Sequence, residues 1–545
     1  MRRRVVAIVG VMAAVVAGCA TADAPTVIDA DVIDADSSST TAVVGSDTAA
    51  PTAPTNTATP SEEPGDEPSN TTSPDAPVTT AVRDTFDDEL VPAIDWVDVG
   101  AGVETAMVLA PLDHTDHSAG TIELFVARHR ATSPDDRIGT MFVNPGGPGF
   151  GGSIYAQYAD QVWDTAIVER FDIVGWDPRG TGFSTPAVDC IDDYDPYFAD
   201  VDITPETADE RTTLLTRSQE VADRCVNELG DVVTLLGTNH TAADIDWLRR
   251  ALDEEQVTYF GFSYGSELGA TWATLFPDTV RAAVLDGAAD PDADPLESSL
   301  QQLTGFEASL TRFLASCSAR SGCAFHNSGD AEGAFDALMA QLDADPVPTV
   351  EGRPPANLTV GINAVIQAMY SESYWGRLER ALADAANGDG AGLLALHDSY
   401  FQRQPDGTWG NELEAFQVIS CADTVERLSV DDEDALVEQY REVAPRLVPE
   451  GSVGVPFCGY LPAPTQDRAE VTGVGAGPIV VIGTTGDPAT PLASTRAMAA
   501  ALEDGRLVVV DAEEHTGYGL NECVVDVVND YLIDLSPPGD VTDCG

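Results

Sequence analysis

A serine between two glycines is the feature of this sequence that most directly suggests chemistry. The pentapeptide Gly261-Phe-Ser263-Tyr-Gly265 follows an apolar, strand-like run at 257–260 and precedes a helix-like segment at 266–276. A strand-turn-helix elbow needs glycines beside the serine because its backbone is strained, and it lifts the hydroxyl above the sheet. A tight packing turn would carry the same glycines. The context favours Ser263 as a nucleophile.

A serine hydroxyl becomes nucleophilic when a base removes its proton, and the base in turn needs an orienting acid. In this arrangement the acid and then the histidine follow the serine along the chain. Three histidines follow Ser263, and two of them, His326 and His397, lie in a long helix-rich segment. The third, His515, lies in a glycine-bearing loop after the last strand-like run. We therefore predict His515 as the base.

The orienting acid should lie in the loop after the preceding strand. Asp487 is the one carboxylate in the turn-rich loop 483–491, and we predict it as the acid. Asp286, which ends an earlier strand-like run in the sequence Leu-Asp-Gly, is the alternative acid. The sequence leaves that alternative open.

A glycine-rich loop at 144–152, Asn-Pro-Gly-Gly-Pro-Gly-Phe-Gly-Gly, follows another strand-like run. Acyl transfer needs N–H donors aimed at the developing oxyanion, and glycines let backbone N–H groups face the reacting centre. We predict an oxyanion hole made by the N–H groups of Tyr264, directly after the nucleophile, and Gly147. A phosphate-binding loop is disfavoured, because the loop lacks a lysine and a Gly-Lys-Ser/Thr ending.

Eight apolar runs, several of them rich in Val and Ile, predict the strands that hold these loops. They lie at 107–112, 121–127, 139–144, 171–176, 257–261, 282–286, 478–483 and 506–511. Helix-like stretches such as 242–252 and 495–502 alternate with them. This alternation predicts an α/β fold, with a mostly parallel sheet covered on both faces and functional loops at the carboxyl ends of the strands.

Between residues 291 and 467 the alternation stops and helix-like segments dominate. They lie at 300–319, 333–342, 362–385, 413–419 and 432–443. A helical insertion between two strands of one sheet predicts a cap over the strand ends, and we call residues 291–467 the lid. The predicted core is then made of two segments, 86–290 and 468–545.

The charge of the chain excludes several classes of function. Its 545 residues include 27 basic and 91 acidic ones, for a formal net charge of −64, and every basic residue is an arginine. A polyanion would be repelled, so we expect no nucleic acid partner. Catalysis by lysine is impossible. We interpret the acidity as surface chemistry of the kind that keeps proteins soluble in salt.

The N-terminus predicts export. Three arginines precede a short apolar run at 5–16, and Val-Ala-Gly-Cys follows. This run is too short to span a bilayer comfortably and is typical of a signal peptide, here residues 1–18. The ending resembles the bacterial lipobox, so we predict lipidation of Cys19, with an ordinary secretory peptide as the alternative. Residues 19–85, rich in Thr, Ala, Pro and Asp, predict a disordered tether. We expect contact with the membrane only through this lipid.

The remaining cysteines form an even set, as expected for disulfides in an exported protein. Nearest-neighbour pairing would close short loops and is the pairing we favour. The pairs are Cys190–Cys225, Cys317–Cys323, Cys421–Cys458 and Cys523–Cys544.

We predict neither a metal site nor a cofactor. The sequence has no Cys-x-x-Cys pair, and we interpret its one closely spaced histidine pair, His114-Thr-Asp-His117, as a solvated loop. We also expect the protein to be a monomer.

Six motifs in this order resemble the tripeptidyl aminopeptidase and prolyl aminopeptidase branch of the α/β-hydrolases. The matching segments are 144–149, 175–182, 261–265, 284–287, 487–491 and the His515 loop. Where the prolyl branch has His-Gly-Gly-Pro-Gly, this chain has Asn-Pro-Gly-Gly-Pro-Gly, which is more similar to the tripeptidyl branch. The resemblance implies acylation of Ser263, and peptide substrates with a free N-terminus held by acidic side chains. Asp177 and Arg179 match a loop of the family, and we interpret them as structural.

Three functions fit these observations. The first is an exported serine exopeptidase that releases short peptides, in particular tripeptides. The second is a carboxylesterase or lipase using the same serine, aspartate and histidine. The third is a binding lipoprotein on a hydrolase scaffold, which the complete set of catalytic residue types disfavours.

Overall fold

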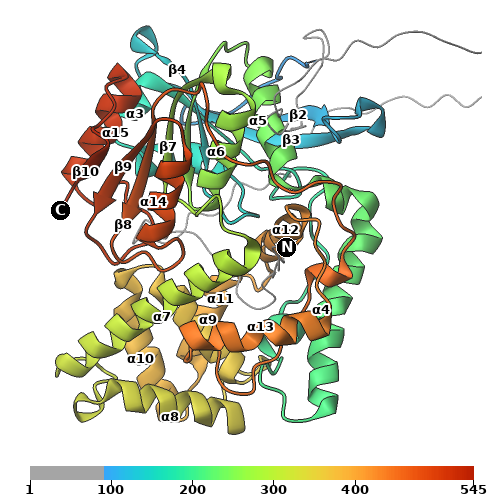
Figure 1. Ribbon diagram of the computed structural model, residues 1–545, viewed down its shortest axis with the longest axis vertical. Coiled ribbons are helices and arrows are strands. Elements are labelled where there is room, and N and C mark those ends of the chain that lie inside the picture. The colour runs from blue at the N-terminus through green and yellow to red at the C-terminus, as the bar shows by residue number, and fades with distance from the viewer. Residues whose placement is uncertain (1–90) are drawn as a thin grey trace, which may run out of the picture. The chain divides into compact units, whose positions relative to one another are not determined.

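The computed structural model describes residues 91–545, which contain one ten-stranded sheet (Figure 1). The strands run in the spatial order β1-β2-β3-β5-β4-β6-β7-β8-β9-β10. Neighbours from β1 to β5 are antiparallel, and those from β5 to β10 are parallel. The prediction of a mostly parallel sheet is therefore confirmed. The bounds are β1 Val97–Gly100, β2 Val103–Pro111, β3 Thr121–His129, β4 Gly139–Asn144, β5 Phe171–Trp176, β6 Val257–Phe262, β7 Val280–Asp286, β8 Ile479–Thr484, β9 Gly505–Val510 and β10 Val541–Asp543.

Helices cover both faces of this sheet because successive strand residues point to opposite sides. In β4, Phe142 belongs to the larger core cluster, with residues of α5, α6 and α14, whereas Val143 belongs to the cluster formed with α1, α3 and α15. Every residue of β4, β6 and β8 is buried. The helices are α5 Thr238–Ala251, α6 Tyr264–Leu275 and α14 Leu492–Ala501 on one face, and α1 Ser153–Gln157, α3 Thr165–Arg170 and α15 Glu522–Asp534 on the other, with the short α2 Ala159–Val162 between α1 and α3.

Seven α-helices lie between β7 and β8 in the sequence, in the segment that we call the lid (Figure 1). The prediction of a single long helix over 362–385 is wrong. The chain leaves the helical conformation at Ser371 (φ −152°, ψ 137°), whose side chain caps a short 3-10 helix, η9 (Glu372–Tyr374). The α-helices are α7 Pro295–Ala319, α8 Ala331–Ala344, α9 Leu358–Met369, α10 Trp375–Ala386, α11 Ala391–Tyr400, α12 Glu412–Ala422 and α13 Val430–Val443.

Part of the chain before the nucleophile also packs against the lid. Thr359 of α9 donates a hydrogen bond of 2.7 Å to the carbonyl of Val201, and Arg353 forms an ion pair of 2.7 Å with Asp195. The long helix α4 (Ala208–Leu229) follows this segment, and Arg211 on it pairs with a carboxylate of α13. Lid packing therefore begins about 100 residues before the boundary expected at residue 291.

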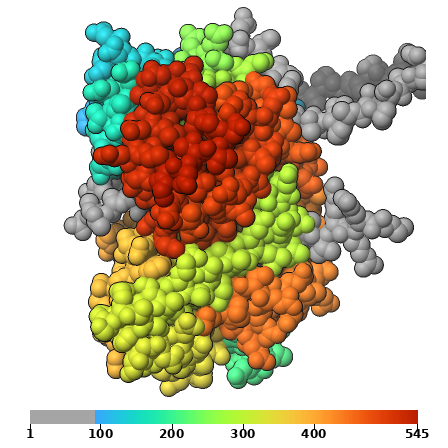
Figure 2. Space-filling view, turned by 60° about the vertical axis from the view of Figure 1, so that its left-hand side comes forward, coloured from blue at the N-terminus to red at the C-terminus, as the bar shows by residue number. Residues whose placement is uncertain are grey.

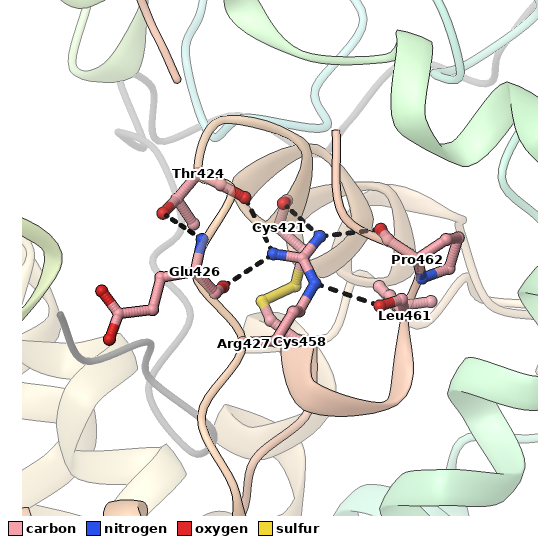
Figure 3. The surroundings of a disulfide bond; sticks show 7 residues. All are labelled: Cys421, Thr424, Glu426, Arg427, Cys458, Leu461 and Pro462. Carbon is pink, nitrogen blue, oxygen red and sulfur yellow. Dashed lines mark hydrogen bonds between the residues drawn. A yellow bond between two sulfur atoms is a disulfide. The ribbon is translucent and has the colours of Figure 1, made fainter. Parts of the chain in front are cut away.

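Residues 91–545 contain four disulfides, and they join the nearest-neighbour pairs that the sequence favoured. Figure 3 shows the surroundings of the pair Cys421–Cys458, where the guanidinium of Arg427 lies among backbone carbonyls. Arg427 donates five hydrogen bonds of 2.8–3.0 Å to the carbonyls of residues 421, 424, 426, 461 and 462. The disulfide and this arginine together fix the end of α12.

The signal peptide, the tether and Cys19 lie outside the described residues. Within residues 91–545, none of the helices is long and apolar enough to cross a membrane.

Candidate active site

Ser263 occupies a strained turn between β6 and α6. Its φ of 53° and ψ of −124° lie outside the regions that a serine usually adopts, and its side chain is almost wholly buried. A Cβ atom on Gly261 would lie 2.2 Å from the carbonyl oxygen of Gly265, and one on Gly265 would lie 2.8 Å from that of Asn144. Glycine is therefore required on both sides of the serine by close backbone approach, as an elbow demands.

His515 and Asp487 form a buried pair. The Nδ1 atom of His515 lies 2.9 Å from both carboxylate oxygens of Asp487. The N–H groups of Ala489 and Thr490 donate to the same carboxylate at 2.9 and 2.8 Å and hold it in place. Because a carboxylate accepts hydrogen bonds, this contact keeps the proton on Nδ1 and leaves Nε2 as the acceptor. Nε2 is buried and has no hydrogen-bond partner among residues 91–545.

Asp286, the alternative acid, has a different position. Its two carboxylate oxygens accept hydrogen bonds of 2.7 Å from the N–H groups of Gly517 and Tyr518, in the loop that carries His515. Its carbonyl accepts a bond of 2.8 Å from the N–H group of Ser263. Burial raises the pKa of Asp286 to about 7, although these donors and His515 oppose the shift. Asp286 thus links the serine turn to the histidine loop, and Asp487 is the residue that meets the imidazole.

The glycine-rich loop passes close to the serine. A Cβ atom on Gly146 would lie 2.5 Å from the carbonyl oxygen of Phe262 and 2.9 Å from the Cβ of Ser263. The N–H group of Gly146 donates to the side chain of Asn144 at 2.9 Å. Within the described part of the chain, the N–H groups of Gly147 and Tyr264 donate to no acceptor. Both groups could therefore donate to an oxyanion, and their assignment as the oxyanion hole stays a prediction.

The structure shows one contact near the acid that the sequence pattern did not predict. Thr490 donates to Asp487 Oδ2 at 3.1 Å, and its hydroxyl lies 3.3 Å from His515 Nδ1. Its position three residues after the acid in a Pro-Ala-Thr-Pro turn was the available signal.

Asp177 and Arg179 hold the fold around the site. Asp177 accepts from the N–H groups of Ser153 and Phe183 at 3.1 and 2.9 Å, and burial raises its pKa. Arg179 donates two bonds, of 2.8 and 2.7 Å, to the buried carboxylate of Asp244. His114 also meets Asp244, at 2.7 Å, and is buried. The interpretation of this segment as a solvated loop is therefore wrong for His114, because its ring satisfies a buried charge.

The lid reaches this site at α12. A Cβ atom on Gly149 in the glycine-rich loop would lie 2.3 Å from the carbonyl of Glu412, at the start of that helix. At its other end, Asp423 accepts hydrogen bonds of 2.6 Å from the N–H and the hydroxyl of Thr238, and that hydroxyl lies 2.6 Å from the Tyr264 hydroxyl. Burial raises the pKa of Asp423 to about 6, moderated by the charge of Arg468.

One group of potential metal ligands lies close together within residues 91–545, namely Cys190, Cys225 and Glu414. Its two sulfurs are joined in a disulfide, so this group offers no thiolate to a metal ion.

Comparison with known proteins places these features in a family. Residues 140–329 match the family described as alpha/beta hydrolase fold, and residues 451–544 match the family described as TAP-like protein. Serine protease Hip1 of Mycobacterium tuberculosis is 32% identical over 467 residues, which cover 82% of this chain and 88% of that protein. The chain belongs to the tripeptidyl aminopeptidase branch of the α/β-hydrolases. The predicted family resemblance is confirmed, and the protein is a serine hydrolase.

Two further relatives in this branch carry different names. Carboxylesterase B of M. tuberculosis is 33% identical over 450 residues, covering 79% of this chain and 84% of that protein. Tripeptidyl aminopeptidase of Streptomyces lividans is 28% identical over 461 residues, covering 81% and 84%. The branch therefore includes members named for peptide and for ester substrates.

Proposed function

We propose that this serine hydrolase is an exported exopeptidase that releases short peptides, in particular tripeptides, from free N-termini. The observation that carries the proposal is the buried contact of 2.9 Å between Asp487 and His515, in a loop that Asp286 links to the serine elbow. The relatives named as a serine protease and a tripeptidyl aminopeptidase favour peptide substrates.

The geometry supports a two-step mechanism. His515 Nε2 takes the proton from Ser263 as its oxygen attacks the scissile carbonyl, and Asp487 stabilises the imidazolium that forms. The N–H groups of Gly147 and Tyr264 bind the oxyanion of the tetrahedral intermediate. When the intermediate collapses, the C–N bond breaks, His515 protonates the leaving amine, and the N-terminal peptide remains as an ester on Ser263. Water, deprotonated by His515, then hydrolyses that ester through a second tetrahedral intermediate.

A carboxylesterase is the second candidate, because a 33% identical relative is named as one and the same groups would cleave an ester. The two activities differ in the leaving group, since an amine must be protonated as it departs and an alkoxide is less dependent on that step. A free N-terminus should matter to the exopeptidase and be irrelevant to the esterase.

One set of assays separates these candidates. The purified protein is given an Ala-Ala-Ala chromogenic amide, its N-acetylated form, a proline amide and a short-chain ester, with Ser263→Ala as the control. We expect Ser263-dependent cleavage of the free tripeptide amide and little cleavage of the acetylated one. Equal cleavage of both would refute the exopeptidase, and ester turnover without amide turnover would establish the esterase.

We also propose that residues 1–18 are removed as a signal peptide and that lipidated Cys19 anchors the protein at the outer face of a membrane. Support comes from the arginine-rich start, the short apolar run and the Val-Ala-Gly-Cys ending. Cys19→Ser should release the protein from membranes into the medium. Retention of that variant on membranes would contradict lipid anchoring.

A further inference from the structure

The lid makes backbone contact with the loop that carries the histidine. The N–H group of His515 donates to the carbonyl of Tyr370 at 2.9 Å, and the N–H group of Glu372 donates to the carbonyl of Glu513 at 3.2 Å. Ser371 and Glu514, between these bonds, face each other as an antiparallel bridge. The lid segment 370–372, which we call the strap, thus pairs with the histidine loop as a short strand would.

Side chains reinforce this pairing. The Ser371 hydroxyl donates to the Glu514 carboxylate at 3.0 Å, and the N–H group of Glu372 lies 3.2 Å from the same oxygen. The ring of Tyr370 lies edge-on to the ring of His515, with centroids 5.6 Å apart. The strap is therefore in contact with both the backbone and the imidazole of His515.

A second lid element joins the acid loop to the histidine loop. Arg312, on α7, donates from Nε to Glu513 at 2.7 Å and from a terminal nitrogen to the carbonyl of Gly486 at 3.1 Å. Gly486 directly precedes Asp487, and Glu513 lies two residues before His515. Figure 2 shows α7, in yellow-green, lying along the edge of the C-terminal core segment, in red. One planar guanidinium thus spans the two loops whose side chains form the Asp487–His515 pair.

We propose that the lid positions the catalytic base, with Arg312 and Ser371 as positioning residues that hold His515 and Asp487 in register for attack by Ser263. This inference rests on the proposed serine chemistry. A helical cover whose one role is to shape a substrate pocket would need no bonds to the backbone of His515. The strap also explains why the helix over 362–385 is broken, because Ser371 must be extended to pair with the histidine loop.

Loss of a positioning residue should lower the rate of reaction at Ser263 far more than it lowers the free energy of unfolding. The Arg312 side chain is 39% exposed, and exposed ion pairs add little to the free energy of unfolding. A displacement of a catalytic group by about 1 Å can lower a rate by about 100-fold. Because backbone bonds between strap and loop remain in the variants, we expect smaller losses than that.

The test compares Arg312→Met, Arg312→Lys and Ser371→Ala with Arg320→Met in the full-length protein. Arg320 is a matched control, because it pairs with Glu379 inside the lid, lies near the end of the same helix and is 49% exposed. Two rates are measured, namely kcat for the Ala-Ala-Ala amide and the rate at which a fluorophosphonate phosphonylates Ser263, with fluoride as the leaving group. The second reaction uses the base but needs no peptide recognition.

We expect Arg312→Met to lower both rates about tenfold and Ser371→Ala about threefold, with KM changed less than twofold. Arg312→Lys should recover part of the loss, since an ammonium group can meet Glu513 but lacks the fork that also reaches Gly486. Arg320→Met should keep wild-type rates, and thermal unfolding should be similar in Arg312→Met and Arg320→Met.

Wild-type rates in both Arg312→Met and Ser371→Ala would overturn the proposal. An increase in KM at constant kcat and constant labelling would also overturn it, by making Arg312 a substrate-binding residue. Failure of the wild-type protein to be labelled at Ser263 would instead refute the serine chemistry on which the proposal depends.

Discussion

Replacing Gly146 by alanine should damage catalysis much more than folding. The new Cβ atom would lie 2.5 Å from the Phe262 carbonyl oxygen and 2.9 Å from the Cβ of Ser263, whereas ordinary contacts begin at about 3.4 Å. The glycine-rich loop must then retreat from the serine by roughly 0.5–0.9 Å, and the N–H group of Gly147 moves with it. A misplacement of about 1 Å can lower a rate about 100-fold, so we expect kcat/KM to fall about 30- to 100-fold.

The same substitution also strains the backbone, because Gly146 has φ of +98°. An alanine in the left-handed region costs about 1–2 kcal/mol. Gly388→Ala separates this strain from the effect of displacement. Gly388, exposed after α10, has φ of +92°, and a Cβ atom there would meet nothing within 4 Å. Gly388→Ala should lower the free energy of unfolding by about the same 1–2 kcal/mol and keep the wild-type kcat/KM.

The assay is kcat/KM for the Ala-Ala-Ala amide, with the free energy of unfolding measured in urea for both variants. The ratio of the two kcat/KM values then reports the displacement of the loop alone. If Gly146→Ala keeps kcat/KM within threefold of Gly388→Ala, the glycine-rich loop does not supply the oxyanion donor. The assignment of Gly147 would then be wrong.

Three further predictions concern the groups around the site. Asp487→Asn should lower kcat about 1,000-fold or more, because it disturbs the imidazole tautomer of His515. Asp286→Asn, whose side chain still accepts one hydrogen bond from the histidine loop, should lower kcat by about tenfold. The reverse order of these two losses in steady-state assays would make Asp286 the acid. Thr490→Val removes the hydroxyl from Asp487 and should lower kcat about tenfold at unchanged KM, and a wild-type kcat would show that this hydroxyl is dispensable. Burial raises the pKa of Glu414 from its usual 4.5 to about 8, so its contribution to stability is present at low pH and is lost as pH rises through 8. Glu414→Gln should therefore flatten the fall in unfolding free energy between pH 5 and 8 by up to about 1.4 kcal/mol per pH unit, and an unchanged slope in urea titrations would contradict this.

Local sequence patterns are enough to predict the site residues that lie in the turn directly after a strand. The apolar run before Ser263 and the glycines beside it identify the elbow, because the backbone approach requires glycine whatever the rest of the fold does. Asp487 and His515 follow in the same way from the turns after β8 and β9. The ends of neighbouring strands bring these turns together. The order of the turns along the chain is therefore enough to predict which residues form the site.

Contacts between distant segments could not be predicted in this way. His114 is buried because Asp244 and Arg179, remote in sequence, need its ring nitrogen. Ser371 lies in a segment whose composition is helical, and the break occurs because its backbone pairs with the histidine loop. Helix propensity is a weak preference that a tertiary contact outweighs.

Every basic residue of the chain is an arginine, and this matters where one side chain bonds to several groups of the chain at once. Arg427 donates to five carbonyls without forming an ion pair in the described structure, and Arg312 bonds a carbonyl and a carboxylate at once. A lysine ammonium has three donors at one point and could not span such sets, whereas the planar guanidinium presents five in a fixed fork. In a chain with 91 acidic residues, attraction alone would bind any cation loosely to many carboxylates. Directional bonds to backbone carbonyls instead hold a guanidinium in one place. For Arg312 that place lies between the loop that carries Asp487 and the loop that carries His515.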